Sequence, residues 1–336
     1  MKLSRHISKI VVLRALQLGD LLCAVPALRA LRAAYPSAEI ALVGLPWASA
    51  FVERFRHIFD RLIEFPGFPG LPERPPRTEE FPAFLESIQR RRFDLALQLH
   101  GSGDFVNPLC ALFGAAQIAG YCTAGGYCPD PKTFMIYPEG LPEIRRHLRL
   151  LEFLGIPAAD ERLEFPLAAR DYEEYLAICS AHSLRDQQCF CVHPGSRSPL
   201  RRWPVEDFAD VTNRVAAHGL HPVLTGTEEE RDLCDRLASL LACPSTNLAG
   251  RTSLGCAAAL LQHVRLLICN DTGVSHIAAA LRVPSVVLFT GSEPERWAPL
   301  DSGLHRAVRA TPFSAASRRT VLQHAEAFLQ LEALYA

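Results

Sequence analysis

The stretch that decides the fold is Arg265–Trp297, with the sequence RLLICNDTGVSHIAAALRVPSVVLFTGSEPERW. Two short apolar runs in it, Leu266–Cys269 and Ser285–Phe289, are typical of buried parallel strands. Between them, the Asn-Asp-Thr-Gly turn at residues 270–273 is rich in helix-capping residues and leads into the Ala-rich segment Val274–Leu281. We therefore expect a strand, a loop, a helix and a second strand, which is the repeating unit of an α/β fold.

The turn at residues 270–273 also indicates a chemistry. A helix that begins there directs unpaired backbone N–H groups toward the end of the preceding strand. Such a helix start binds anions, especially phosphates, and ligands of open α/β sheets lie outside the carboxyl ends of the strands. We expect a phosphate-containing ligand at Thr272 and Gly273.

The same stretch resembles the C-terminal signature of glycosyltransferase family 9, the heptosyltransferase family. The resemblance lies in the order Asp-Thr-Gly-x-x-His, an Ala-rich helix, a Val-Pro strand and a loop opened by a small residue. Taken singly, Asp271 would serve equally as a helix cap, Gly273 as a turn residue and His276 as a core residue, but the whole string favours the functional interpretation. The resemblance implies that Asp271 holds sugar hydroxyls and that His276 supports the loop.

The N-terminal segment shows a second β-α-β pattern. We expect a strand at Lys9–Leu13, a loop at Arg14–Asp20, a helix at Leu21–Ala34 and a strand at Glu39–Val43. The turn is not a G-x-G-x-x-G fingerprint, which disfavours a dinucleotide site of the usual kind.

The turn at Gly19 and Asp20 resembles the N-terminal signature of the same family, together with Arg14 before it and Pro26-Ala27-Leu28 after it. In that family the aspartate is the proposed catalytic base. From the local sequence alone Asp20 is equally a helix cap. Agreement with the distant signature at Asp271 favours the catalytic interpretation.

A third candidate segment, His193–Pro204, follows an expected strand at Cys189–Val192. Gly195 and Ser196 form a tight loop there, and Arg201 and Arg202 add fixed positive charge suited to bidentate diphosphate binding. The segment resembles the family's His-Pro-Gly-small…Lys-x-Trp-Pro sequence, with Arg201 where a lysine is usual. The alternative is that both arginines are merely solvated.

Three further groups are candidates by resemblance. His100 and Gly101 follow a strand expected at Asp94–Leu99 and should edge the acceptor side of the cleft, where His100 either touches substrate or caps the strand. One of the three consecutive glutamates at residues 228–230 should contact the ribose hydroxyls. The sequence does not distinguish them, and we take Glu229 as the candidate. Ser253 or Thr252 should cap the helix that follows. The three glutamates are Glu228, Glu229 and Glu230.

The length of 336 residues and the β-α alternation in each half predict two domains. We expect an acceptor-binding domain at residues 1–160, a linker at Pro157–Arg170 and a nucleotide-sugar-binding domain at residues 171–315. A helix at residues 316–336 is expected to pack back on the first domain. The fold class implied by the resemblance is GT-B, an α/β fold with two Rossmann-like domains facing a central cleft.

The bulk composition excludes several classes of protein. A formal net charge of −1 gives no global attraction for nucleic acid. The 11 cysteines are odd in number and form no C-x-x-C pair, as expected of buried thiols in a reducing cytosol. Arg14 and Asp20 interrupt any signal-peptide core, and no apolar run of membrane-spanning length exists. We expect a cytoplasmic protein, and the family resemblance implies that it meets a glycan or glycolipid acceptor at the surface of the inner membrane.

The resemblance implies an inverting glycosyltransferase with ADP-heptose as donor and a lipopolysaccharide core or another glycan as acceptor. Asp20 would take the proton of the acceptor hydroxyl, and no metal cofactor is expected because no D-x-D or metal-ligand cluster adjoins the phosphate loops. Two alternatives stay open, a nucleotide-sugar epimerase of the same fold and a non-catalytic sugar-nucleotide-binding protein.

Overall fold

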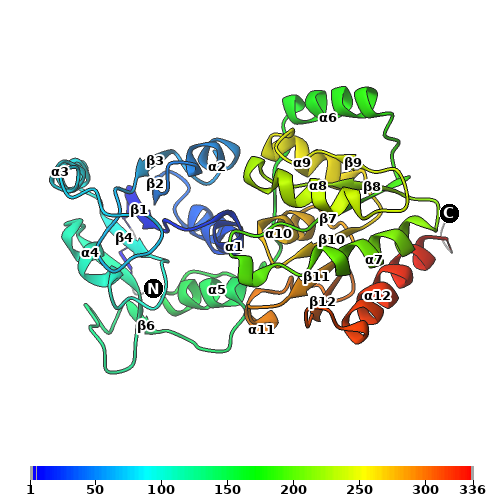
Figure 1. Cartoon of the computed structure of the whole chain (residues 1–336). Coiled ribbons are helices and arrows are strands. Elements are labelled where there is room, and N and C mark those ends of the chain that lie inside the picture. Colours follow the sequence, from blue (N-terminus) through cyan, green and yellow to red (C-terminus); the bar gives the residue numbers. More distant parts are fainter. Residues whose placement is uncertain (1–2, 5, 334–336) are drawn as a thin grey trace. The chain divides into compact units, whose positions relative to one another are not determined.

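The computed structural model describes residues 3–4 and 6–333 and divides the chain into two compact units, residues 1–163 and 164–336. Each unit contains one parallel six-stranded sheet with helices packed against it (Figure 1). The two units are described separately below.

The sheet of the first unit has the strand order β3-β2-β1-β4-β5-β6. This is the strand order of the Rossmann fold, in which the direction of winding reverses between the first and the fourth strand. The reversal places the loops after β1 and β4 side by side at the carboxyl ends of the strands. The strands are β1 (Lys9–Leu13), β2 (Glu39–Gly44), β3 (Arg61–Glu64), β4 (Leu95–Gln98), β5 (Gln117–Cys122) and β6 (Phe134–Ile136).

Five helices accompany this sheet in the described part of the unit. One apolar face of the sheet packs against α3 and α4, through residues such as Phe84 and Leu109, and α1 packs against α5. The helices are α1 (Leu18–Ala34), α2 (Ala48–Arg54), α3 (Phe81–Arg91), α4 (Val106–Leu112) and α5 (Glu143–Phe153).

The sheet of the second unit has the order β12-β11-β10-β7-β8-β9. Counted from its own first strand, β7, this is the same Rossmann order, with the reversal between β7 and β10. The strands are β7 (Cys189–His193), β8 (His221–Leu224), β9 (Thr246–Asn247), β10 (Leu267–Asn270), β11 (Ser285–Phe289) and β12 (His305–Arg309).

The helices of the second unit include two short 3₁₀ segments, η1 and η2. The α12 helix packs on α7 and on strands β11 and β12 of its own unit. Its expected contact with the first domain stays a prediction, and the last three residues of that segment lie outside the described residues. The elements are α6 (Ala169–His182), η1 (Pro199–Arg201), α7 (Val205–Ala216), η2 (Glu228–Glu230), α8 (Arg231–Ser239), α9 (Leu254–Gln262), α10 (Gly273–Ala280), α11 (Pro294–Trp297) and α12 (Ala315–Ala333).

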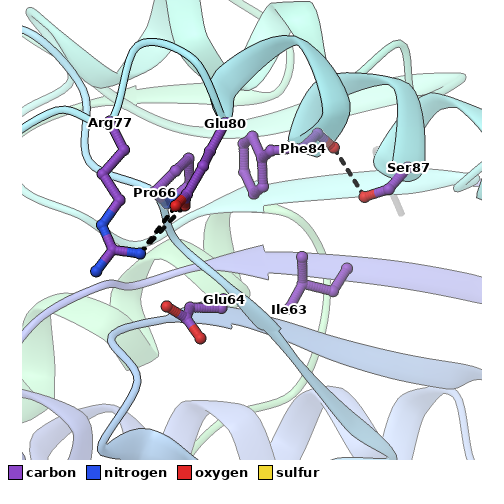
Figure 2. A pocket seen from close by; sticks show the side chains of 7 residues that line it. All are labelled: Ile63, Glu64, Pro66, Arg77, Glu80, Phe84 and Ser87. Carbon is purple, nitrogen blue, oxygen red and sulfur yellow. Dashed lines mark hydrogen bonds and ion pairs between the residues drawn. The ribbon is translucent and has the colours of Figure 1, made fainter.

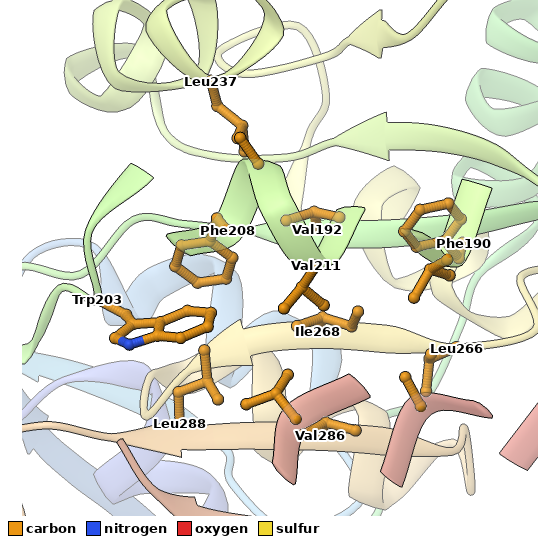
Figure 3. Packing of buried hydrophobic residues seen from close by; sticks show 14 of the residues in the cluster. Phe190, Val192, Trp203, Phe208, Val211, Leu237, Leu266, Ile268, Val286 and Leu288 are labelled. Carbon is orange, nitrogen blue, oxygen red and sulfur yellow. The ribbon is translucent and has the colours of Figure 1, made fainter. Parts of the chain in front are cut away.

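A buried apolar cluster fills the space between one face of this second sheet and the α7, α8 and α12 helices (Figure 3). Alternate strand residues such as Ile268 and Leu288 point into it, as the two-residue period of a strand requires. Trp203 lies in the same cluster, edge-on to Phe208 at 5.2 Å between ring centroids. The loop that carries Ser196, Arg201 and Arg202 is therefore anchored in the core through Trp203.

The structure corrects one boundary that matters for function. The sequence predicted a loop up to Asp20 and a helix from Leu21, but α1 begins at Leu18. The Asp20 carboxylate oxygen Oδ2 accepts a hydrogen bond from the Gln17 N–H at 3.2 Å, which satisfies a backbone donor at the helix start. Gly19 and Asp20 consequently lie in the first helical turn.

Candidate functional site

The carboxyl ends of the four strands at the two winding reversals carry most of the candidate residues. In the first unit, Asp20 follows β1 and His100 follows β4. In the second unit, the His193–Pro204 segment follows β7 and the turn at residues 270–273 follows β10. Ligands of Rossmann-type sheets bind in the crevice at such a reversal. The candidates therefore form two groups, one in each unit.

Asn270, the last residue of β10, connects the two loops of the second unit. Its side chain is fully buried. The amide nitrogen Nδ2 donates to the Pro194 carbonyl at 2.7 Å, and the oxygen Oδ1 accepts from the Trp203 N–H at 3.0 Å. The sequence singled out this asparagine only as part of a turn. The structure shows that it fixes both ends of the Ser196–Arg202 loop against the start of α10.

The Asp271 carboxylate is buried directly beside this loop. Its Oδ2 accepts a hydrogen bond from the Ser292 hydroxyl at 2.6 Å and lies 3.9 Å from the Arg201 guanidinium nitrogen Nη1. The Arg201 side chain remains 43% exposed, so a ligand can contact it. Ser292 had no role assigned from the sequence, although it lies in the small-residue loop that follows β11.

Arg202 points in another direction. Its Nε donates to the Ser196 carbonyl at 2.8 Å, and Ser196 itself is buried. Arg202 thus stabilises the loop backbone from within. The two adjacent arginines have different environments, because Arg201 faces Asp271 and Arg202 holds the Ser196 backbone.

Thr272 and Gly273 form the start of α10. Thr272 has an extended backbone, with φ −148° and ψ 175°, and Gly273 is the first helical residue. The Thr272 hydroxyl is buried and has no hydrogen-bond partner among the residues the structure describes. One turn further along α10, His276 is buried. It neighbours His305, whose pKa is lowered to about 4, mainly by burial.

The three glutamates after β8 have distinct positions. Glu228 forms an ion pair with Arg231 at 2.5 Å, and Glu229, the middle residue of η2, is exposed. Glu230 is buried, and its carboxylate accepts from the Thr227 N–H at 2.9 Å. A Cβ atom on Gly195 would overlap that carboxylate. Glu230 is therefore the member of the trio that touches the loop after β7, which the sequence did not distinguish.

The acceptor-side candidate His100 is tied to the loop between β1 and the first turn of α1, the turn that carries Asp20. The Nδ1 atom of His100 accepts from the Ala15 N–H at 3.1 Å, and its Nε2 atom lies 3.4 Å from the Glu73 carboxylate. His100 thus joins the β4 loop to the β1 loop. Gly101 is exposed, with φ +72°, a conformation that favours glycine.

A pocket of about 410 Å³ lies elsewhere in the first unit, between β3 and α3 (Figure 2). Arg77 and Glu80 form an ion pair of 3.0 Å at its rim, and Phe84 supplies an apolar wall. No candidate residue lines it.

Comparisons with known proteins show the family of this chain. A family model described as glycosyltransferase family 9 (heptosyltransferase) matches residues 83–321. The chain belongs to this family. It is 26% identical, over 87% of its length and 85% of the relative's, to lipopolysaccharide heptosyltransferase 2 of Escherichia coli K12.

Solved structures support the family fold. A glycosyltransferase family 9 protein from Veillonella parvula matches with a TM-score of 0.79 and 20% identity, covering 98% of this chain and 99% of that one. The E. coli ADP-heptose heptosyltransferase II matches with a TM-score of 0.75 and 24% identity, covering 97% and 99%. This family 9 glycosyltransferase has the GT-B fold, as the sequence predicted.

In residues 3–4 and 6–333, no helix is both long and apolar enough to cross a membrane. Within the same residues, no group of three or more His, Cys, Asp or Glu side chains has the arrangement of a metal site.

Proposed function

We propose that this glycosyltransferase transfers heptose from ADP-heptose to a hydroxyl group of a lipopolysaccharide core, with inversion at the anomeric carbon. The main support for this proposal is the arrangement of side chains around Asn270, where the winding reverses between β7 and β10. It brings together a partly exposed Arg201, a buried Asp271 and the start of α10. This combination suits a nucleoside diphosphate that carries a sugar. Relatives named as lipopolysaccharide heptosyltransferases support the choice of sugar and acceptor.

The second unit would hold the donor. The backbone N–H groups at Thr272 and Gly273, together with Arg201, would bind the diphosphate and stabilise the negative charge that develops on it as ADP leaves. Asp271 would accept hydrogen bonds from sugar hydroxyls, and one glutamate of the η2 segment would meet the ribose. With charge stabilisation supplied by these groups, the reaction is proposed to proceed without a metal ion.

Asp20 would act as the general base. It removes the proton of the acceptor hydroxyl while that oxygen bonds to the anomeric carbon and the bond from this carbon to the diphosphate oxygen breaks. Attack from the face opposite the leaving group inverts the configuration. The acceptor would be met at the membrane surface by the first unit.

A donor screen tests the proposal. The protein is incubated with a heptose-deficient lipopolysaccharide acceptor and with ADP-heptose, UDP-sugars or GDP-sugars in turn, and nucleotide release is measured. We expect release from ADP-heptose that depends on the acceptor. Nucleotide release only from a UDP- or GDP-sugar would refute the proposed donor, and nucleotide release that does not need the acceptor would indicate a hydrolase.

A further inference from the structure

Arg14, the residue after β1, has a fully buried guanidinium group. A buried charge is costly unless it is paired and fully hydrogen-bonded, so its partners indicate what it is there to hold. The sequence marked Arg14 only as part of the N-terminal signature and gave it no role.

The guanidinium of Arg14 connects three elements. Its Nε donates to the Asp20 carbonyl at 2.8 Å, in the first turn of α1. Its Nη1 donates to the Leu99 carbonyl, at the end of β4. Its Nη2 lies 3.3 Å from the Glu143 carboxylate, at the start of α5. A lysine has a single ammonium group and cannot reach three acceptors in these directions.

Glu143 is itself held in place by a buried network on α5. Its carboxylate pairs with Arg146 and lies 3.2 Å from the His147 nitrogen Nε2. Burial, followed by the charge of Arg14, lowers the pKa of His147 to about 4, so this imidazole is neutral near pH 7. The Tyr121 hydroxyl donates to the Arg146 carbonyl at 2.9 Å. The anchor for Arg14 is therefore buried and held by several hydrogen bonds and ion pairs.

The helical turn that carries Asp20 is consequently held from two sides. The Asp20 carbonyl accepts a hydrogen bond from Arg14, and the Asp20 carboxylate oxygen Oδ2 accepts one from the Gln17 N–H at 3.2 Å. We propose that Arg14 is a positioning residue, which fixes the first turn of α1 so that the Asp20 carboxylate points at the acceptor hydroxyl. This inference rests on the proposed function, in which Asp20 is the base.

The test is a double-mutant cycle of Arg14→Lys and Asp20→Asn. Arg14→Lys is expected to lower kcat by ten- to a hundredfold, the scale of a misplacement of about 1 Å, and to leave the Kd for ADP unchanged. In the Asp20→Asn background the same substitution should change kcat less than about twofold, because residues that act as a unit are non-additive.

Arg32→Lys is the matched control. Arg32 lies in the last turn of the same helix, where its guanidinium donates to the Ile58 carbonyl at 2.8 Å and pairs with Asp60 at 2.6 Å. Like Arg14, it links α1 to another segment through a backbone carbonyl and a carboxylate, but at the opposite end of the helix. We expect a loss of stability from this variant without a change in kcat.

Three results would overturn the inference. The first is a normal kcat for Arg14→Lys, and the second is an equal loss of kcat in both backgrounds, which would indicate general destabilisation. If Asp20→Asn alone keeps normal turnover, the base assignment fails and the role of Arg14 fails with it.

Should Arg14→Lys not fold, as judged by ADP binding and circular dichroism, Glu143→Gln replaces it in the cycle. That variant keeps an oxygen acceptor for Arg14, and the same non-additive pattern is expected with a smaller loss of kcat.

Discussion

Replacement of Asn270 by alanine tests the arrangement of the donor loop. The substitution leaves two buried backbone groups without partners, the Trp203 N–H and the Pro194 carbonyl, because both bond to this side chain. Each unsatisfied buried group costs about 1–3 kcal/mol, so the free energy of unfolding would fall by about 2–6 kcal/mol if the loop did not move at all. The exposed part of the loop can relax toward water, and we expect a loss of about 2–4 kcal/mol.

The same substitution should weaken ADP binding at least about tenfold, since a misplaced loop loses its charge-assisted contacts to the diphosphate. Urea unfolding measures the stability and calorimetry measures the affinity. Asn213→Ala is the control, because the Asn213 side chain also bonds two backbone groups of the second unit, the Leu240 carbonyl and the Ala242 N–H. It should cost stability and leave the ADP affinity unchanged. ADP affinity within twofold of the parent for Asn270→Ala would refute the role given to Asn270.

Four further predictions follow from individual contacts. Asp20→Asn should reduce turnover at least ~10²-fold at unchanged ADP affinity, and near-normal turnover would remove it as the base. Gly195→Ala should destabilise the protein by about 1–3 kcal/mol in urea unfolding, because the added Cβ overlaps the Glu230 carboxylate; unchanged stability would contradict this packing. His147 and His305 have pKa values lowered to about 4, so the folded state binds fewer protons than the unfolded state between about pH 4 and 6.5. The contribution of these histidines to the free energy of unfolding should therefore be complete above about pH 6.5. It should fall as the pH drops toward 4, by up to about 3 kcal/mol for each histidine. A urea midpoint that stays constant over that range would argue against two neutral histidines. Finally, EDTA should leave the transfer rate unchanged, whereas a loss reversed by added metal would show that the diphosphate needs a cation.

The buried strands were predictable from the sequence, because runs of apolar residues bounded by turns have few alternatives. Strand β10 was expected at Leu266–Cys269 and is found at Leu267–Asn270. The short strands β3 and β12 were not expected, since their sequences, RLIE and HRAVR, mix charged and apolar residues at partly exposed edges of the sheets. A helix cap was expected from residue type at Thr252 or Ser253, and in the structure the Ser253 hydroxyl accepts from the Cys256 N–H.

The candidate site was predictable in its positions but not in its contacts. The Asp20 and Asp271 positions follow from strand ends, which the sequence reveals. The partners of Arg14 are 6, 85 and 129 residues away along the chain, so no local pattern indicates that this arginine is buried. Likewise, the sequence does not show which of the glutamates at residues 228–230 contacts the loop after β7, because that depends on which side chain packs against Gly195.

The configuration of the product is the most direct test of the central claim. ADP-heptose of defined anomeric configuration is incubated with the protein and a heptose-deficient lipopolysaccharide core acceptor, and the new glycosidic bond is examined by NMR. The account predicts a single heptose added per acceptor, with inverted configuration at the anomeric carbon and one ADP released per bond formed. Retention of configuration, or ADP release with no heptose on the acceptor, would contradict it.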